Sequence, residues 1–189
     1  MSQAKVLTEA EIKRVLAVVS HQGFLSPRNR LVVMVSFLGG LRAGEIASLK
    51  LRHVINEDGS VRDRIHLSNG ETKGDRQRTV FVGKKLQKEI GRYMKVRRWN
   101  TLDVPLIRSQ KGGHFSPTTM VMLFRRIYDQ AGIRDARSHS GRRSFITKLA
   151  NKGVSVFVLQ QLAGHRSIQT TQGYVTVNSE MLVSAADMA

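Results

Sequence analysis

Four residues in the last third of the chain could grip, protonate and attack a phosphate. His139 and Arg142 stand three positions apart, His165 lies in Leu-Ala-Gly-His-Arg-Ser, and Tyr174 ends Thr-Thr-Gln-Gly-Tyr. In a helix that begins near His139, Arg142 lies one turn further along the same face, so imidazole and guanidinium can converge on one anion. The N-terminus of that helix adds its own partial positive charge. This order and spacing indicate a chemical site rather than a merely basic surface.

Arginine is suited to holding a phosphate during transfer. Its planar guanidinium donates two parallel hydrogen bonds to phosphate oxygens and stays charged at any working pH. A second arginine, Arg42, follows Gly39-Gly-Leu41 and opens another short predicted helix. Because Arg42 and Arg142 come from different helices, they could clamp both non-bridging oxygens and stabilise the extra charge of a pentacoordinate phosphorus.

Tyr174 supplies the nucleophile that an arginine clamp lacks. A phenol has an ordinary pKa of about 10, so it attacks when a base accepts its proton or nearby cations favour the phenolate. Lys73, expected in a hairpin turn, could protonate the leaving oxygen as a general acid, although Arg76 and Arg78 are alternatives for that role. His165 could donate a hydrogen bond to a non-bridging oxygen.

Composition indicates which phosphate the site meets. The 189 residues include 31 Lys and Arg against 14 Asp and Glu, a formal net charge of +17, and this field attracts polyanions such as nucleic acid. Ribosomal and chromatin proteins have a similar balance, so charge alone does not indicate catalysis. The absence of cysteine excludes disulfides and thiolate chemistry, and no histidines have a metal-type spacing, so we expect no metal site. Without a long apolar run or a signal peptide, the chain is predicted to be cytoplasmic and not membrane-bound.

The periodicity predicts a mainly α fold with a small antiparallel β-sheet (α+β), in one domain that spans residues 1–189. The expected helices run from the capping box Thr8-Glu-Ala-Glu11 to Gly23, from Ser26-Pro27 to Gly39-Gly40 as the central core helix, and over Ala43–Leu49, Lys84–Trp99, Ser116–Ala131 and His139–Lys152. Two shorter helices are capped by Ser155 and Ser167, a final amphipathic segment runs from Asn178 to Met188, and strands at 62–67 and 78–82 flank a tight turn at 72–75.

These motifs, taken together, resemble the tyrosine recombinases, or phage-type integrases, whose catalytic domain is related to type IB topoisomerases. The resemblance covers nearly the whole chain: Leu7-Thr-Glu-Ala-Glu, Gly-Leu-Arg42-Ala-Gly-Glu45, Thr-Lys73-Gly, His139-x-x-Arg142-Arg-Ser-Phe, Leu-Ala-Gly-His165-Arg-Ser-Ile-Gln-Thr-Thr and Tyr174. The sequence departs from the family at Gly141, at Arg143-Ser144 and at Ala163, where a bulky apolar residue, His-Thr and leucine are common.

The resemblance implies a metal-free mechanism that needs no cofactor or ATP. Tyrosine attacks a DNA phosphodiester, forms a 3′-phosphotyrosyl link and releases a 5′-hydroxyl that later attacks a partner strand. By this resemblance Arg42, Arg142 and His165 bind the scissile phosphate, Lys73 is the general acid and His139 assists proton transfer. Tyr174 is the nucleophile, and Glu45 supports Arg42.

The resemblance also implies how the protein meets its partners. Double-stranded DNA would be bound by a monomer in isolation and by a homo-tetramer on paired sites. Family members commonly carry an N-terminal helical domain that closes around DNA, and we expect that core-binding domain to be absent from this chain. The segment after Val177 is either an ordinary final core helix or, as in the family, a tail that docks onto a neighbouring protomer.

Two other functions remain open on the residues alone. One is a DNA-binding regulator or directionality factor that keeps the fold without turnover, although a pure binder needs no tyrosine at position 174. The other is a topoisomerase IB-like nicking-closing enzyme that rejoins the same strand. The predicted 116–131 helix carries four side chains that could contact DNA, Thr118, Thr119, Arg125 and Arg126, and the sequence does not distinguish base contacts from phosphate contacts among them. The sequence also does not distinguish integration from excision, inversion or resolution.

Overall fold

A computed structural model describes residues 3–69 and 77–175 together with 182, 183, 186 and 187. The predicted turn at 72–75, with Lys73 and the neighbouring Arg76, lies outside the described residues. So does most of the predicted segment Asn178–Met188. Among the described residues, no helix is both long enough and apolar enough to cross a membrane.

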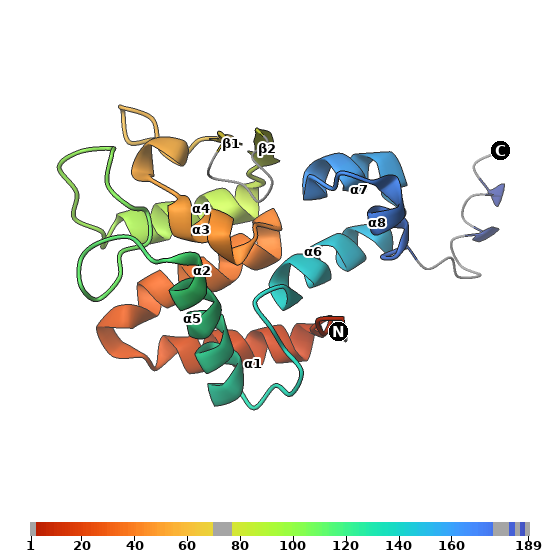
Figure 1. Ribbon diagram of the computed structural model, residues 1–189, viewed down its shortest axis with the longest axis horizontal. Coiled ribbons are helices and arrows are strands. Elements are labelled where there is room, and N and C mark those ends of the chain that lie inside the picture. Colours follow the sequence, from red (N-terminus) through yellow and green to blue (C-terminus); the bar gives the residue numbers. More distant parts are fainter. Residues whose placement is uncertain (1–2, 70–76, 176–181, 184–185, 188–189) are drawn as a thin grey trace.

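The described elements follow one another as the sequence predicts, with helices on both sides of a two-stranded sheet (Figure 1). In chain order they are α1 (Glu9–Ser20), the 3-10 turn η1 (Gly23–Leu25), α2 (Ser26–Gly39), α3 (Ala43–Ser48), the 3-10 turn η2 (Leu51–His53), β1 (Arg64–Leu67), β2 (Arg78–Phe81), α4 (Lys84–Met94), α5 (Pro117–Gln130), α6 (Ser140–Ala150), α7 (Val156–Ala163) and α8 (Ile168–Gln172).

Helix α2 is the centre of the core, as its apolar composition predicts. Leu31, Val32, Val33 and Val35 are all buried, and the helix packs against α1, α3, α4 and α6. A helix that is apolar on most sides has no face to turn to water, so neighbours must cover it all round. Figure 1 shows α1 to α5 gathered on one side, with α6 leading away from them to α7 and α8.

The two strands form an antiparallel ladder in which Arg64 pairs with Phe81 and Leu67 with Arg78. Ile65 and Val80 point into the core, which explains the alternation of charged and apolar residues in the sequence. Strand β2 contacts α7 and therefore brings its first residue, Arg78, toward the end of the chain that carries His165 and Tyr174.

Local signals predicted the helix ends well at the polar caps and less well elsewhere. The Thr8–Glu11 capping box is present, and the hydroxyls of Ser116, Ser155 and Ser167 accept backbone hydrogen bonds at the starts of α5, α7 and α8. Helix α1 ends at Ser20 rather than Gly23, and Ser26 lies inside α2, whose cap is Leu25.

The prediction that a helix runs from Lys84 to Trp99 was wrong at its C-terminal end, because α4 ends at Met94. Beyond it, the buried guanidinium of Arg97 donates hydrogen bonds to the carbonyls of Arg98 and Pro105. These bonds fix the backbone in a loop rather than a further helical turn.

A glycine allows α6 to approach α2 closely. A Cβ at Gly141 would lie 2.4 Å from Ser36 Oγ and 2.9 Å from Ser36 Cβ, closer than side-chain atoms pack. Gly141 and Ser36, both small, therefore allow the two helices to approach this closely, and a bulky residue at position 141 would not fit. This contact sets the position of α6, the helix that carries Arg142.

We expect Gly141→Ala to destabilise the fold by about 1–3 kcal/mol, because the added methyl overpacks the α2–α6 contact. The matched control is Gly91→Ala in α4, where the nearest atom, Val61 Cγ2, would be 3.9 Å from the new Cβ. That substitution should stabilise by about 0.5–1 kcal/mol through helix propensity. Urea unfolding measures both free energies, and two changes of the same sign would contradict the packing argument.

Candidate active site

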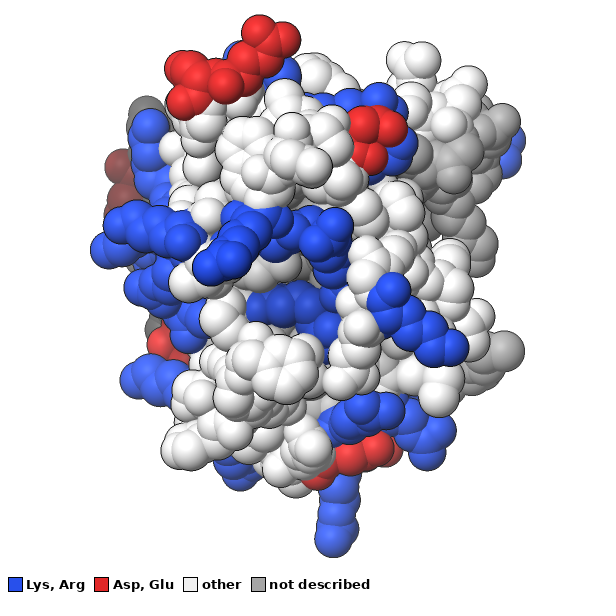
Figure 2. Space-filling view, turned by 90° about the vertical axis from the view of Figure 1, so that its left-hand side faces the viewer, with Lys and Arg blue, Asp and Glu red and all other residues white. Residues whose placement is uncertain are grey.

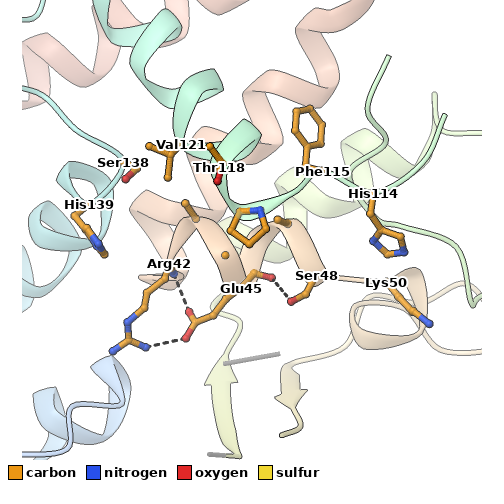
Figure 3. Close-up of a pocket in the computed structure, with 14 residues that line it drawn as sticks. Arg42, Glu45, Ser48, Lys50, His114, Phe115, Thr118, Val121, Ser138 and His139 are labelled. Atoms are coloured by element: carbon orange, nitrogen blue, oxygen red, sulfur yellow. Dashed lines mark hydrogen bonds and ion pairs between the residues drawn. The ribbon is translucent and has the colours of Figure 1, made fainter. Parts of the chain in front are cut away.

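Arg42 is held at the start of α3 by the buried carboxylate of Glu45. The Glu45 side chain is only 1% exposed and accepts from the Arg42 backbone N–H at 2.7 Å and from Arg42 Nη1 at 2.8 Å. One carboxylate therefore caps the helix and orients the guanidinium (Figure 3). The arrangement is compatible with the supporting role expected for Glu45, which stays a prediction.

Arg142 lies on the first turn of α6, almost completely buried. Its Nη1 donates to the carbonyl of Gly40 at 2.6 Å and its Nη2 donates to the carbonyl of Ala163. Burial, followed by the charges of Arg42 and Arg78, lowers the pKa of Arg142 to about 9, so the guanidinium is still protonated at neutral pH. Uncharged carbonyls orient this arginine without neutralising it.

His165 follows α7 and is half-buried against the same arginines. Burial, and next the charges of Arg142, Arg42 and Arg78, lower the pKa of His165 to about 4, so its imidazole is neutral at pH 7. His165 Nδ1 lies 2.9 Å from the hydroxyl oxygen of the buried Thr171. When that hydroxyl donates, the ring proton resides on Nε2, which is then free to donate to a substrate oxygen.

Tyr174 packs on His165 just after α8. The two rings stack with centroids 5.6 Å apart, and the Arg143 guanidinium carbon lies 5.8 Å from the Tyr174 ring centroid. The phenol therefore stands beside Arg143 and is stacked on the histidine that faces Arg42, Arg78 and Arg142.

His139 occupies the N-cap position of α6 and lines an open pocket together with Arg42 (Figure 3). The pocket has a volume of about 860 Å³ and lies between α3 and α5. Its lining residues are Arg42, Ala43, Gly44, Glu45, Ala47, Ser48, Lys50, His114, Phe115, Pro117, Thr118, Val121, Ser138 and His139. Of the predicted site residues, Lys73 alone lies outside the described residues.

Arg78 belongs to this cluster, although the sequence suggested it only as an alternative to Lys73. Its side chain is 9% exposed, its Nε lies 3.7 Å from Glu45 Oε1, and its Nη1 donates to the carbonyl of Ala163, the same oxygen that Arg142 binds. Gly164 has a positive φ of 61°, and a Cβ there would lie 2.9 Å from Arg78 Nη1. In the sequence, the one signal that could have placed Arg78 in this cluster was its position at the start of a predicted strand.

Arg143 and Ser144, which depart from the family pattern, attach the N-terminal segment to α6. Arg143 Nη1 donates to the carbonyl of Ala4 at 2.8 Å, and the Ser144 hydroxyl accepts from the Leu7 backbone N–H at 2.8 Å. Sequence reasoning missed both roles, because no local pattern indicates which distant backbone group a side chain will meet.

The arrangement can bind a phosphate and attack it. Three guanidinium groups, from Arg42, Arg78 and Arg142, converge on the α7–α8 connection with one carboxylate, Glu45, among them. A neutral imidazole and a phenol stand beside them. Among the described residues, no group of three or more His, Asp or Glu could hold a metal ion.

Comparisons with known proteins confirm the resemblance. The phage integrase family matches residues 5–181. Tyrosine recombinase XerA of Pyrococcus horikoshii is 32% identical over 190 residues, which cover 100% of this chain and 62% of that protein. XerC of Lactobacillus leichmannii is 28% identical over 92% of this chain and 59% of its own length. The chain thus spans about three-fifths of these relatives.

Solved structures confirm the mainly helical fold with its two-stranded antiparallel sheet. A crystal structure of XerA recombinase superposes with a TM-score of 0.74 at 26% identity and covers 100% of this chain and 64% of that one. The XerH recombinase bound to its difH substrate before cleavage superposes with a TM-score of 0.68 at 24% identity, over 96% of this chain and 53% of that one.

We expect the stability of the free protein to depend on pH through His165. The lowered pKa means that the unfolded chain, with an ordinary value of 6.5, binds the proton more tightly than the folded chain. The stabilisation by the neutral imidazole is therefore fully present above pH 6.5 and is lost as the pH falls toward 4. The free energy of unfolding in urea should be measured at pH 7.5, 6 and 5. As the pH falls over this range, His165→Gln should lose less stability than wild type.

His21→Gln controls for the removal of one imidazole from an exposed position. Equal pH slopes in wild type and His165→Gln would contradict the buried, arginine-facing environment of His165.

Proposed function

The chain belongs to the phage integrase family of tyrosine recombinases, and from that premise we propose that it is a site-specific DNA recombinase acting through a covalent 3′-phosphotyrosyl intermediate. The convergence of Arg42, Arg142 and His165 beside Tyr174 carries this proposal. This arrangement places a nucleophile beside side chains that can bind a phosphate. A DNA-binding regulator would need the phosphate-binding side chains but no nucleophile.

In this reaction the arginines bind the scissile phosphate. Arg42, with a side chain 23% exposed, reaches the substrate from α3, while the buried Arg142 fixes the opposite side from α6. Both gain hydrogen-bond strength as charge develops on the non-bridging oxygens, because the surroundings are preorganised and partly dry. His165 adds an Nε2–H donor that carries no charge at neutral pH.

Tyr174 attacks the phosphorus, so a P–Oη bond forms while the bond to the 5′ oxygen breaks. The phenolate that develops is stabilised by the guanidinium groups of Arg142 and Arg143. Lys73 gives its proton to the leaving 5′ oxygen, and His139 assists proton transfer at the rim of the pocket it shares with Arg42. Attack by a 5′-hydroxyl on the tyrosyl ester reverses these steps and rejoins DNA.

We place this activity in one catalytic domain over residues 1–189, acting as a homo-tetramer on paired sites and as a monomer in isolation. A λ integrase relative of the same fold is described as a dimer bound to a DNA core site. The net charge of +17 supports DNA binding without identifying the site. With chromosomal or mobile DNA as its substrate, the protein works in the cytoplasm at the nucleoid.

A nicked duplex substrate tests the nucleophile. Cleavage beside the nick releases a short fragment, so rejoining fails and the covalent protein–DNA adduct accumulates. Tyr174→Phe should abolish the adduct on a denaturing gel, because only the phenolic oxygen can form the ester. Tyr128→Phe, which removes the hydroxyl of a buried core tyrosine, is the matched control and should retain it.

The same substrate separates the competing functions. A wild-type protein that binds duplex DNA but forms no adduct on its cognate site acts as a regulator. Adducts that are resealed only on the original strand, with no exchange between two sites, identify a nicking-closing enzyme instead.

The role of Lys73 as general acid is tested with a substrate in which sulfur replaces the bridging 5′ oxygen. A thiol with an ordinary pKa of about 8.5 leaves without protonation, whereas an alkoxide does not. Lys73→Ala should lose roughly 100-fold or more in cleavage of the oxygen substrate and regain most of it with sulfur. Arg42→Ala, which weakens phosphate binding, should be impaired on both. If sulfur fails to rescue Lys73→Ala, the general acid is another residue.

A further inference from the structure

A second cluster of arginines lies at the opposite end of α2 from the candidate active site. Arg28 is on the first turn of α2, Arg97 and Arg108 are in the loops between α4 and α5, and Arg126 is on α5. These loops and the α1–α2 connection form the left-hand end of the molecule in Figure 1. Figure 2 shows Lys and Arg gathered across the middle of this face, with Asp and Glu toward its edges.

Arg28 is 9% exposed and is built into this end of the fold. Its Nε and Nη2 donate to Asn29 Oδ1 at 2.9 and 2.7 Å, and its Nη1 donates to the carbonyl of Arg108 at 3.2 Å. Its guanidinium carbon lies 5.2 Å from the ring centroid of Phe115. Arg28 thus sets the backbone of the loop from which the exposed side chain of Arg108 projects.

Arg97 is equally buried, and part of its hydrogen-bonding capacity is unused. It donates through Nη1 to the carbonyl of Arg98 and through Nη2 to the carbonyl of Pro105 at 3.1 Å. Its Nε is buried and has no hydrogen-bond partner among the described residues. A buried donor without a partner is uncommon in folded proteins and needs a physical explanation.

Within the described part of the chain, no carboxylate forms an ion pair with these arginines. Among the described residues, none of the ion pairs includes Arg28, Arg97, Arg108 or Arg126, whereas Arg30, two positions from Arg28, is paired with Glu89 at 2.8 Å. Burial, followed by the charge of Arg108 among other effects, lowers the pKa of Arg97, and burial with the charge of Arg126 lowers that of Arg28. Burial raises the pKa of the Tyr93 phenol, against the charges of Arg97, Arg28 and Arg108, so one hydroxyl senses three guanidinium groups.

We propose that Arg28, Arg97, Arg108 and Arg126 form a second phosphate-binding site, outside the catalytic centre, that takes the backbone of duplex DNA. The inference rests on the proposed function, since it assumes that duplex DNA is the substrate. The exposed side chains of Arg108 and Arg126 contact the phosphate oxygens, while Arg28 and Arg97 beneath them fix the loops and add positive potential. The missing counter-charge is then supplied by the nucleic acid.

The position of the cluster favours a polymer over a small anion. Phe115, on which Arg28 packs, also lines the pocket that contains Arg42, so the two basic regions meet at this ring. Arg28 and Gly39 are separated by the length of α2, about 17 Å at 1.5 Å per residue. One DNA strand carries a phosphate about every 3.4 Å along the duplex axis, so a span of this size corresponds to about five base pairs. A duplex held at the catalytic arginines is long enough to reach the second cluster.

The test measures binding of the full chain to a duplex of about 30 base pairs by fluorescence anisotropy at several salt concentrations. Arg108→Gln with Arg126→Gln removes two exposed charges and leaves the buried arginines in place, so folding should be retained. The slope of log affinity against log salt should fall by about one to two units, and affinity near 0.1 M salt by about tenfold or more. The control, Lys13→Gln with Arg14→Gln, makes the same charge change on the exposed face of α1.

Each outcome decides the inference. Equal slopes for the double variant and its control, with wild type binding duplex normally, would overturn the second site and leave the recombinase proposal intact. Loss of binding to inorganic phosphate without any change in duplex binding would assign the cluster to a small anion instead. A wild-type protein that binds no duplex would overturn both proposals. The variant with Arg108→Gln and Arg126→Gln should still form the covalent Tyr174 adduct at saturating DNA, which distinguishes this site from the catalytic centre.

Discussion

The candidate active site depends on one carboxylate among three guanidinium groups. Glu45 binds Arg42 directly and lies 3.7 Å from Arg78, while Arg142 senses all three. The positive charges of the three arginines repel one another, and the repulsion is strong where little water screens it. The fold offsets the repulsion in two ways: the buried Glu45 supplies a negative charge, and backbone carbonyls accept hydrogen bonds from each of the three arginines.

The carbonyls orient the arginines without cancelling their charge. Gly40, Ala163 and Gly164 present oxygens to Arg42, Arg78 and Arg142, and none of these acceptors carries a formal charge. A carboxylate at each position would fix the geometry equally well but would leave little positive potential for a phosphate. The two glycines have positive φ and permit the turns that aim these carbonyls inward. The same backbone carbonyls therefore orient the arginines and leave their positive charge available.

What could be predicted from the sequence is what depends on local physics. Caps such as Thr8 and Ser155, the glycine break before Arg42, and the spacing of His139 and Arg142 specify elements through contacts within a few residues. Arg78 depends on partners far along the chain, Glu45 and the carbonyl of Ala163. Arg78 was ambiguous beside Lys73 because a strand pattern indicates which face a residue occupies, but not which helix that face will meet. The α4 boundary similarly required knowledge of the loop carbonyls bound by Arg97.

Tyr174, the proposed nucleophile, is held more loosely than the arginines that we propose bind the phosphate. The arginines are fixed by hydrogen bonds to a carboxylate and carbonyls, whereas Tyr174 is positioned by stacking on His165 and by the charge of Arg143 over its ring. Within the described part of the chain, its hydroxyl forms no hydrogen bond. Ring contacts of this kind contribute on the order of 1 kcal/mol each, so a phosphate can draw the phenol into line at small cost. Because the imidazole of His165 is neutral, it does not repel the arginines before the substrate binds. The arginines that we propose bind the phosphate are therefore fixed in advance, and the proposed nucleophile can align on the phosphate once it is bound.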